Sequence, residues 1–285
     1  MATPLLMTPA RRITLLLGVP AALIAIGWTA LAAVAWAGRG SFPVHFSVPA
    51  RGRQVTLSVG GGTVLVRPGT GSRVAVSGTV HYSLVRPKVS LRSAASGVAV
   101  DSSCSARAVS SCSFDYAVAV PAGLGADISV GSGDLSARGL SGPVRLAAQS
   151  GDITASALSG HVQIWSQSGD ITATALSGPV TDFQDQAGNI KVTFLSGQDV
   201  TVSDQAGNIT LDFAVVPRRV AVTVQAGNIT LVLPPGSTAY RVTTRTSSGN
   251  TVTDVPTDPG SSHVITATAQ SGDITIVRRL LEFNP

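Results

Sequence analysis

The 285-residue sequence has very few of the charged residues that usually cover the surfaces of helical proteins. It contains one glutamate, Glu282, and two lysines, Lys88 and Lys191, and only 12% of its residues are charged. Helix surfaces are usually rich in Glu and Lys, so this shortage excludes a fold built from long amphipathic helices. The many Gly, Ser, Thr, Val and Ala residues favour short strands joined by turns instead.

A concentrated positive surface is also missing. The net charge is +5, but Arg11, Arg12 and Arg39 flank an apolar N-terminal segment, and without them the remainder carries only +2. The other arginine doublets, at 218–219 and 278–279, are isolated, and we expect them to be solvated turn or terminal charges. This distribution excludes a groove for nucleic acid.

Recognisable catalytic and metal-binding motifs are missing as well. The four histidines are dispersed and form no H-E-x-x-H pattern: His45, His81, His161 and His263. No G-x-S-x-G elbow occurs. The GGG at 60–62 lacks the Lys-Ser/Thr of a phosphate loop, and we expect a hairpin turn there. We therefore expect no enzymatic activity and no cofactor.

One long uncharged segment runs from Ile13 to Ala37. At about 1.5 Å per residue, its 25 residues can cross a hydrocarbon core of about 30 Å. The A-x-A pattern at 35–37 leaves a cleaved signal peptide open, although the apolar region of a signal peptide usually spans only about 7–15 residues. We predict a single-pass signal-anchor helix at 13–37, with residues 1–12 as a cytoplasmic tail and the rest outside the cytoplasm.

The two cysteines, Cys104 and Cys112, agree with export from the cytoplasm. They are separated by seven residues, and neither has the CxxC or Cys/His spacing of a zinc site. In an oxidising compartment they would close a small loop as a disulfide, which restricts the unfolded chain by roughly 2–3 kcal/mol. Two free, buried thiols are the alternative.

A glycine turn recurs through the second half of the sequence, as in AQSGDITA from Ala148 and SQSGDITA from Ser166. Each turn is a Gly followed by Asp or Asn, and the successive glycines are 18 to 23 residues apart. Such a cadence is typical of a solenoid, in which each coil covers the apolar face of its neighbour. The predicted turns are Gly133-Asp134, Gly151-Asp152, Gly169-Asp170, Gly188-Asn189, Gly207-Asn208, Gly227-Asn228, Gly249-Asn250 and Gly272-Asp273.

The residues between these turns alternate between apolar and polar, as half-buried strands require. Ile153, Ile171 and Ile190 take the same position in successive repeats, and Ala155, Ala173 and Val192 lie two residues further on. A third inward column is expected two residues beyond that, and its increasing size predicts a core that widens toward the C-terminus. Its members would be Ala157, Ala175, Phe194, Phe213 and Leu233.

These patterns predict an all-β fold: a β-solenoid or β-helix-like ectodomain with an irregular N-terminal β cap, preceded by one transmembrane helix. We place a linker at 38–50, the cap with Cys104 and Cys112 at 51–125, and the β-solenoid repeats at 126–285. The segment from Ile274 onward is expected to supply the closing strand.

One pair of acidic residues stands apart from the turn motif. Asp185 and Asp204 each lie three residues before a repeat glycine, so they should be neighbours on adjacent coils, about 5 Å apart. An exposed acidic patch is the simplest interpretation, and a weak cation site or a retaining glycosidase pair is the alternative. Asp182 falls in an inward column, and we expect a local shift that packs Phe183 there instead.

The stretch VPAG…DISVGSGDLSARGLSGPVRL, with the anchor and the recurring SGDI and AGNI turns, resembles the bacterial putative-adhesin family over roughly residues 50–280. The resemblance implies a surface-facing β-solenoid of unknown biochemical activity, often tethered by one helix, and some relatives are associated with envelope-stress systems. The Ala-Gly-Asn turns here depart from the Ser-Gly-Asp pattern.

Three functions are compatible with these features. The first is a non-enzymatic, membrane-anchored adhesin or envelope scaffold that presents a Thr/Ser-rich face to a cell-wall glycan, a surface glycan or an envelope protein. The second is an envelope-stress accessory that binds a membrane signalling partner. The third is a polysaccharide-cleaving β-helix that uses Asp185 and Asp204.

Overall fold

The computed structural model describes residues 38–50, 52–94, 97–104 and 111–279. This part of the chain is all-β and contains no helix, so it holds no helix that could span a membrane. The predicted transmembrane segment 13–37 lies outside the described residues.

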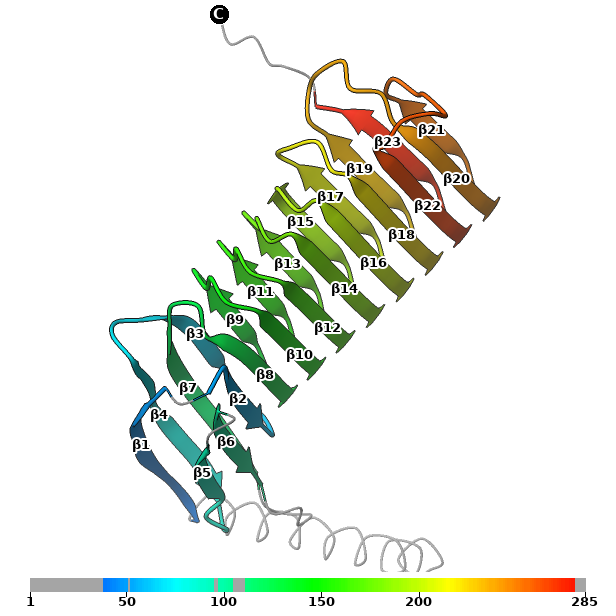
Figure 1. The fold of residues 1–285 in the computed structure, drawn as a ribbon. Coiled ribbons are helices and arrows are strands. Elements are labelled where there is room, and N and C mark those ends of the chain that lie inside the picture. Colours follow the sequence, from blue (N-terminus) through cyan, green and yellow to red (C-terminus); the bar gives the residue numbers. More distant parts are fainter. Residues whose placement is uncertain (1–37, 51, 95–96, 105–110, 280–285) are drawn as a thin grey trace, which may run out of the picture.

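The described residues form twenty-three strands (Figure 1). The N-terminal strands are β1 (Arg39–Pro49), β2 (Gln54–Val59), β3 (Val64–Gly69), β4 (Arg73–Ser83), β5 (Lys88–Ala94), β6 (Gly97–Ser103) and β7 (Cys112–Pro121). The following strands are β8 (Gly125–Ser132), β9 (Leu135–Arg138), β10 (Val144–Ser150), β11 (Ile153–Ser156), β12 (Val162–Ser168), β13 (Ile171–Thr174), β14 (Val180–Ala187), β15 (Ile190–Leu195), β16 (Asp199–Ala206) and β17 (Ile209–Phe213). The last are β18 (Arg219–Ala226), β19 (Ile229–Leu233), β20 (Arg241–Ser248), β21 (Thr251–Asp254), β22 (Val264–Ser271) and β23 (Ile274–Arg278).

The strands form two sheets, and each coil of the chain contributes one strand to each. The order is β1-β4-β7-β3-β9-β11-β13-β15-β17-β19-β23-β21 in the 12-stranded sheet and β20-β22-β18-β16-β14-β12-β10-β8-β2-β6-β5 in the 11-stranded sheet. From β8 onward all pairings are parallel, and Figure 1 shows the coils side by side as a ladder.

The predicted apolar columns form the core between the sheets. Ile153 pairs with Ile171, which pairs with Ile190, and each of the three side chains is fully buried. The same register continues through Ile209, Ile229 and Ile274. Strands one repeat apart therefore lie side by side and share continuous apolar rows.

The turn glycines stack directly on one another. A Cβ added to Gly151 or Gly169 would lie closer than 3.0 Å to the carbonyl oxygen of the glycine in the adjacent coil, and the same holds at all eight repeat turns. Six of the eight also have φ between +116° and +146°, a region that favours glycine. Glycine is therefore required at these turns mainly because a neighbouring backbone fills the place of its side chain.

The third inward column differs from the prediction. Ala157, Ala175 and Phe194 have φ of 51°, 56° and 54°, and this left-handed backbone turns their side chains out of the core. The next residue in each coil points inward instead, and β15 shifts its register so that Leu195 pairs with Phe213. The buried column is thus Leu140, Leu158, Leu176, Leu195, Phe213 and Leu233, and the expected widening from Ala to Phe was wrong.

The N-terminal part is more regular than the sequence indicates. Residues 38–50 are not a linker, because β1 pairs antiparallel with β4 at the edge of the 12-stranded sheet. The GGG at 60–62 is not a hairpin turn either, since β2 and β3 belong to different sheets. Gly62 instead lies under Gly133, so β2 and β3 form a coil of the solenoid.

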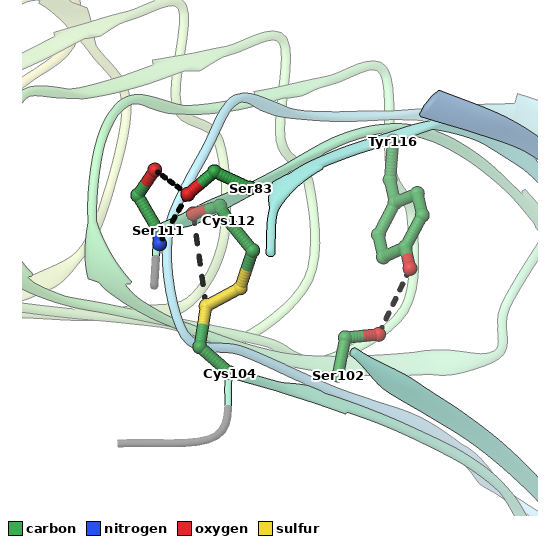
Figure 2. Close-up of a disulfide and its surroundings, with 6 residues drawn as sticks. All are labelled: Ser83, Ser102, Cys104, Ser111, Cys112 and Tyr116. Carbon is green, nitrogen blue, oxygen red and sulfur yellow. Dashed lines mark hydrogen bonds between the residues drawn. A yellow bond between two sulfur atoms is a disulfide. The ribbon is translucent and has the colours of Figure 1, made fainter. Parts of the chain in front are cut away.

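The outer N-terminal coil, β6 and β7, is closed by the two cysteines (Figure 2). Cys104 follows β6 and Cys112 begins β7, so the disulfide joins the end of a strand in one sheet to the start of a strand in the other, with the two Cα atoms 6.0 Å apart. Beside it, the buried hydroxyls of Ser102 and Tyr116 share a hydrogen bond of 2.9 Å. Antiparallel strands β5 and β4 then cover this end of the two sheets.

The C-terminal end also departs from the prediction. The segment from Ile274 does not close the solenoid, because β22 and β23 insert between β18/β19 and β20/β21. The closing coil carries threonine at positions that are aliphatic or alanine in the inserted coil: Thr244, Thr246, Thr251 and Thr253. A polar outermost coil loses less free energy in contact with water than an aliphatic one, which accounts for this order.

Replacing Gly169 with alanine should destabilise the protein by about 3 kcal/mol or more, because backbone strain adds to a clash with Gly151. Gly236→Ala is the matched control: φ there is +146°, but nothing lies within 4 Å of the added methyl group. Denaturant unfolding of both variants measures the difference. Equal losses of stability would contradict the stacking explanation.

Candidate functional site

The Asp or Asn that follows each turn glycine forms one continuous hydrogen-bonded ladder. The side chain of Asp152 accepts the backbone amide of Asp170 at 2.9 Å, and that of Asp170 accepts the amide of Asn189 at 2.8 Å. Asn189, Asn208 and Asn228 continue the same pattern. These predicted turn residues therefore tie neighbouring coils together, and the ladder accounts for the repeated motif structurally.

The coil inserted at the C-terminus completes this ladder. The amide of Asp273 donates to Asn228 Oδ1, and Asp273 Oδ1 accepts the amide of Asn250, both at 2.8 Å. The ladder thus runs from Asn228 to Asp273 in the inserted coil and then to Asn250 in the outermost coil. Asp273 consequently lies between two uncharged asparagines, which avoids repulsion between adjacent carboxylates.

Asp185 and Asp204 are brought together, but inside the protein. They pair in register on β14 and β16, as predicted, and only 4% and 2% of their surfaces are exposed. The expected exposed acidic patch is therefore wrong. One carboxylate oxygen of each residue, Oδ2, is buried without a hydrogen-bond partner.

The other carboxylate oxygen of each residue caps its own turn. Asp185 Oδ1 accepts the amide of Gln186 at 2.8 Å, and Asp204 Oδ1 accepts the amide of Ala206 at 3.1 Å. The unpartnered Oδ2 atoms lie beneath the turn glycines, 2.7 Å and 2.9 Å from the positions that a Cβ on Gly188 and Gly207 would take. The absence of glycine side chains thus leaves room for the carboxyl groups.

Burial dominates the electrostatics of this pair. Removal from water raises the pKa of Asp185, with a smaller contribution from Asp170, while nearby amides and the Ser166 hydroxyl lower it. Burial and the neighbouring Asp185 raise the pKa of Asp204 to about 6. Both carboxyl groups therefore bind a proton more tightly in the folded protein than in an unfolded chain.

The sequence carried a signal for this burial. The position three residues before a repeat glycine points into the core. In successive coils it holds Val130, Ala148, Ser166, Asp185, Asp204 and Val224, all of which are buried. Phe183 pairs with Ile164 and is buried, while Asp182 pairs with the outward Gln163, as predicted. The same alternation applied two residues further along would have placed both aspartates inside.

The buried location limits the chemistry of the pair. A glycosidase needs both carboxyl groups beside an open cleft that admits the sugar, and these lie in the core between two sheets. Calcium takes about 6–8 oxygen ligands. The described residues contain no cluster of three or more His, Cys, Asp or Glu side chains, so the weak cation site gains no further ligand of these types.

The outer face of the 11-stranded sheet carries an array that sequence reasoning missed. One exposed glutamine lies two residues before the turn glycine in each of six coils: Gln149, Gln167, Gln186, Gln205, Gln225 and Gln270. Trp165 lies on the same face, between Ala147 and Gln184 on the adjacent strands. The fixed spacing of Gln before Gly could have revealed the row.

The opposite sheet carries the threonine row that the alternation predicts. Thr154, Thr172, Lys191, Thr210 and Thr230 pair in register on its outer face. Each sheet thus presents straight rows of hydrogen-bonding side chains, one coil apart.

Comparison with known families gives one match, to the family described as Toastrack DUF4097, over residues 116–277. This match confirms the family resemblance drawn from the turn motif. No curated protein matches the chain.

Several solved structures are similar in fold at low identity. A putative adhesin from Bacteroides fragilis is 11% identical with a TM-score of 0.48, over 84% of this chain and 97% of that one. A putative adhesin from Parabacteroides distasonis is 11% identical with a TM-score of 0.46, over 83% and 97% of the two chains.

The stability of the protein should depend on pH through Asp204. Its pKa is about 6 when folded and about 3.9 in an unfolded chain, so the folded state binds the proton more tightly. Its contribution to stability therefore increases as the pH falls from about 7 to about 4, by on the order of 2–3 kcal/mol in total.

Asp204→Asn should stabilise the protein at neutral pH and remove this dependence, whereas Asp182→Asn, on the outer face of the same sheet, should preserve it. Thermal unfolding at a series of pH values measures both variants. Identical profiles for Asp204→Asn and the unaltered protein would contradict a buried, proton-binding Asp204.

Proposed function

This chain belongs to the Toastrack DUF4097 family, and from that premise we propose that it is a non-catalytic, membrane-anchored surface protein of the bacterial envelope. Its β-solenoid acts as a stiff rod that holds rows of polar side chains away from the membrane and binds an envelope component with them. The protein would thus serve as an adhesin or an envelope scaffold.

The observation that carries this proposal is the pair of regular outer faces. Rows of Gln on one sheet and Thr on the other repeat with the coil spacing of about 4.8 Å, while the buried acidic pair is closed to substrate. Because the backbone of the paired strands is already ordered, binding costs only the rotamer freedom of the side chains that make contact, and an extended partner can make many such contacts along the rod.

The location outside the cytoplasm is supported by the 25-residue apolar segment at 13–37 and by the bonded cysteines. Disulfides persist in oxidising compartments and are rare in the cytoplasm. The rod would therefore begin at β1, directly after the membrane span.

The oxidation state in cells tests this location. Cells producing the full chain are quenched in acid, and the proteins are then treated with a maleimide polymer that adds mass to each free thiol. We expect no adduct before reduction and two after it, at Cys104 and Cys112. Two adducts without reduction would place the domain in a reducing compartment and contradict the proposal.

Binding to envelopes tests the function. The full chain in lipid nanodiscs should sediment with isolated bacterial envelopes, and a triple change of Gln167, Gln186 and Gln205 to alanine should weaken binding at least tenfold. The matched triple change of Thr154, Thr172 and Thr210 to alanine on the opposite sheet measures the share of the second row, and unchanged binding in both triple variants would contradict binding through these rows. If the unaltered protein fails to sediment with envelopes, the adhesive and scaffolding roles are both wrong.

A further inference from the structure

Trp165 is the one aromatic side chain on the outer face of the 11-stranded sheet, counted over β2, β8 and the coils that follow in the described ranges. Trp165 lies on β12 and is half-buried. The positions beside it on the two adjacent strands are Ala147 on β10 and Gln184 on β14. Ala147 has a small side chain, and it lines a surface hollow together with Trp165. A large apolar ring in a row of polar residues calls for an explanation beyond the packing of the sheet.

The surface is hollowed on both sides of this indole. On one side a hollow of about 350 Å³ extends toward β2 and β6, and its lining includes Ser58, Ser129, Ala147 and Gln149. The surface is recessed there because the outward residues of these strands are serine, alanine and glycine, which have small side chains or none. Trp165 forms the wall at the far end of this hollow.

On the other side, a smaller hollow of about 90 Å³ is lined by Arg145, Gln163, Asp182 and Gln184 together with Trp165. Arg145 and Asp182 lie on either side of Gln163 on adjacent strands, so one positive and one negative charge flank the site. The local charge is therefore balanced, which favours an uncharged ligand over a phosphate or a polyanion.

The chemistry of this lining matches a sugar ring. Glutamine amides donate and accept hydrogen bonds at once, as neighbouring hydroxyl groups on a sugar require, and Arg145 and Asp182 supply a further donor and acceptor. The C–H groups on the face of a pyranose form an apolar patch that packs on an indole. An acyl chain, by contrast, would need a mainly apolar slot, whereas the smaller hollow is lined mainly by polar and charged side chains and the larger one carries four serines and Gln149 among its apolar residues.

The direction of the hollows favours a chain of sugars over a single one. The two hollows overlap at β10 and β12, and together they span β6, β2, β8, β10, β12 and β14, which are neighbours along the stacking direction of the coils in Figure 1. Gln149 lines the larger hollow and begins the row of exposed glutamines that continues through the later coils. A linear glycan laid along this direction meets a new polar side chain at each coil, about every 4.8 Å.

We propose that Trp165 and the two hollows beside it form a binding site for a linear glycan of neutral pyranose sugars, with Trp165 as the stacking platform. The proposal rests on the proposed function and identifies the envelope component as a polysaccharide. Gln149, Gln163 and Gln184 bind the hydroxyl groups, and Arg145 and Asp182 fix the orientation of the sugar above the smaller hollow.

The indole itself reports on binding. The other two tryptophans, Trp28 and Trp36, lie in the apolar N-terminal segment, so changing both to phenylalanine in the full chain leaves Trp165 as the single tryptophan, which is excited selectively over the tyrosines. Titration with the β-1,4-linked hexasaccharides of glucose and of N-acetylglucosamine should give a saturable change in its emission with at least one of them. No saturable change with either hexasaccharide, and none with purified cell-wall polysaccharide, would overturn the proposal.

Variants separate a binding role from a folding role. In a sedimentation assay with insoluble polysaccharide, Trp165→Ala should weaken binding at least tenfold, and Trp165→Tyr should retain most of it because the ring is kept. Thr223→Ala, at the equivalent outward position of β18, should change neither binding nor the unfolding temperature. If Trp165→Ala does not fold, the comparison of Trp165→Tyr with Gln163→Ala decides, and unchanged binding in both overturns the site.

The experiments can disprove the glycan site and still leave the proposed function standing. Unaltered binding of Trp165→Ala to whole envelopes, with no binding of the unaltered protein to any saccharide, would overturn the glycan site and leave the adhesive role intact. Failure of the unaltered protein to bind envelopes and saccharides alike would overturn both.

Discussion

The contact of one turn glycine with the next sets the geometry of the molecule. Each carbonyl oxygen occupies the place where the adjacent coil would carry a Cβ, so the backbones approach as closely as paired strands allow. That approach lets the Asp or Asn of one turn accept the amide of the next, and it keeps the strands of both sheets in register. A larger residue at any of these turns would separate the coils and break the ladder beside it.

Regular stacking creates a problem at both ends, since each terminal coil exposes a face that its neighbours would bury. At the N-terminal end, antiparallel strands β4 and β5 cover the last parallel coil, and the Cys104–Cys112 disulfide joins the two strands of that coil. At the C-terminal end, the chain places its threonine-rich coil outermost and returns to insert an aliphatic one. In both places the order in space differs from the order in sequence.

Much of the fold followed from the sequence, because period-two alternation and a fixed repeat length are local properties. They correctly predicted the shared isoleucine rows, the stacked turns and the inward Phe183. The third column failed because Ala157, Ala175 and Phe194 adopt a left-handed backbone that breaks the alternation, and nothing in their side chains signals it. Of the candidate site, the pairing of Asp185 with Asp204 was predicted, whereas their burial and the place of Trp165 beside two hollows were not.

The sequence by itself determined the all-β class, the coil length, the residues that stack and their family. Only the tertiary structure decided which coil lies outermost at each end, which carboxylates leave water, and which polar rows share a face. The physical reason is that hydrogen bonding within a coil and between identical turns is set by residues a fixed distance apart. The order of the coils and the burial of a side chain depend instead on the total exposed apolar surface, which no local pattern contains.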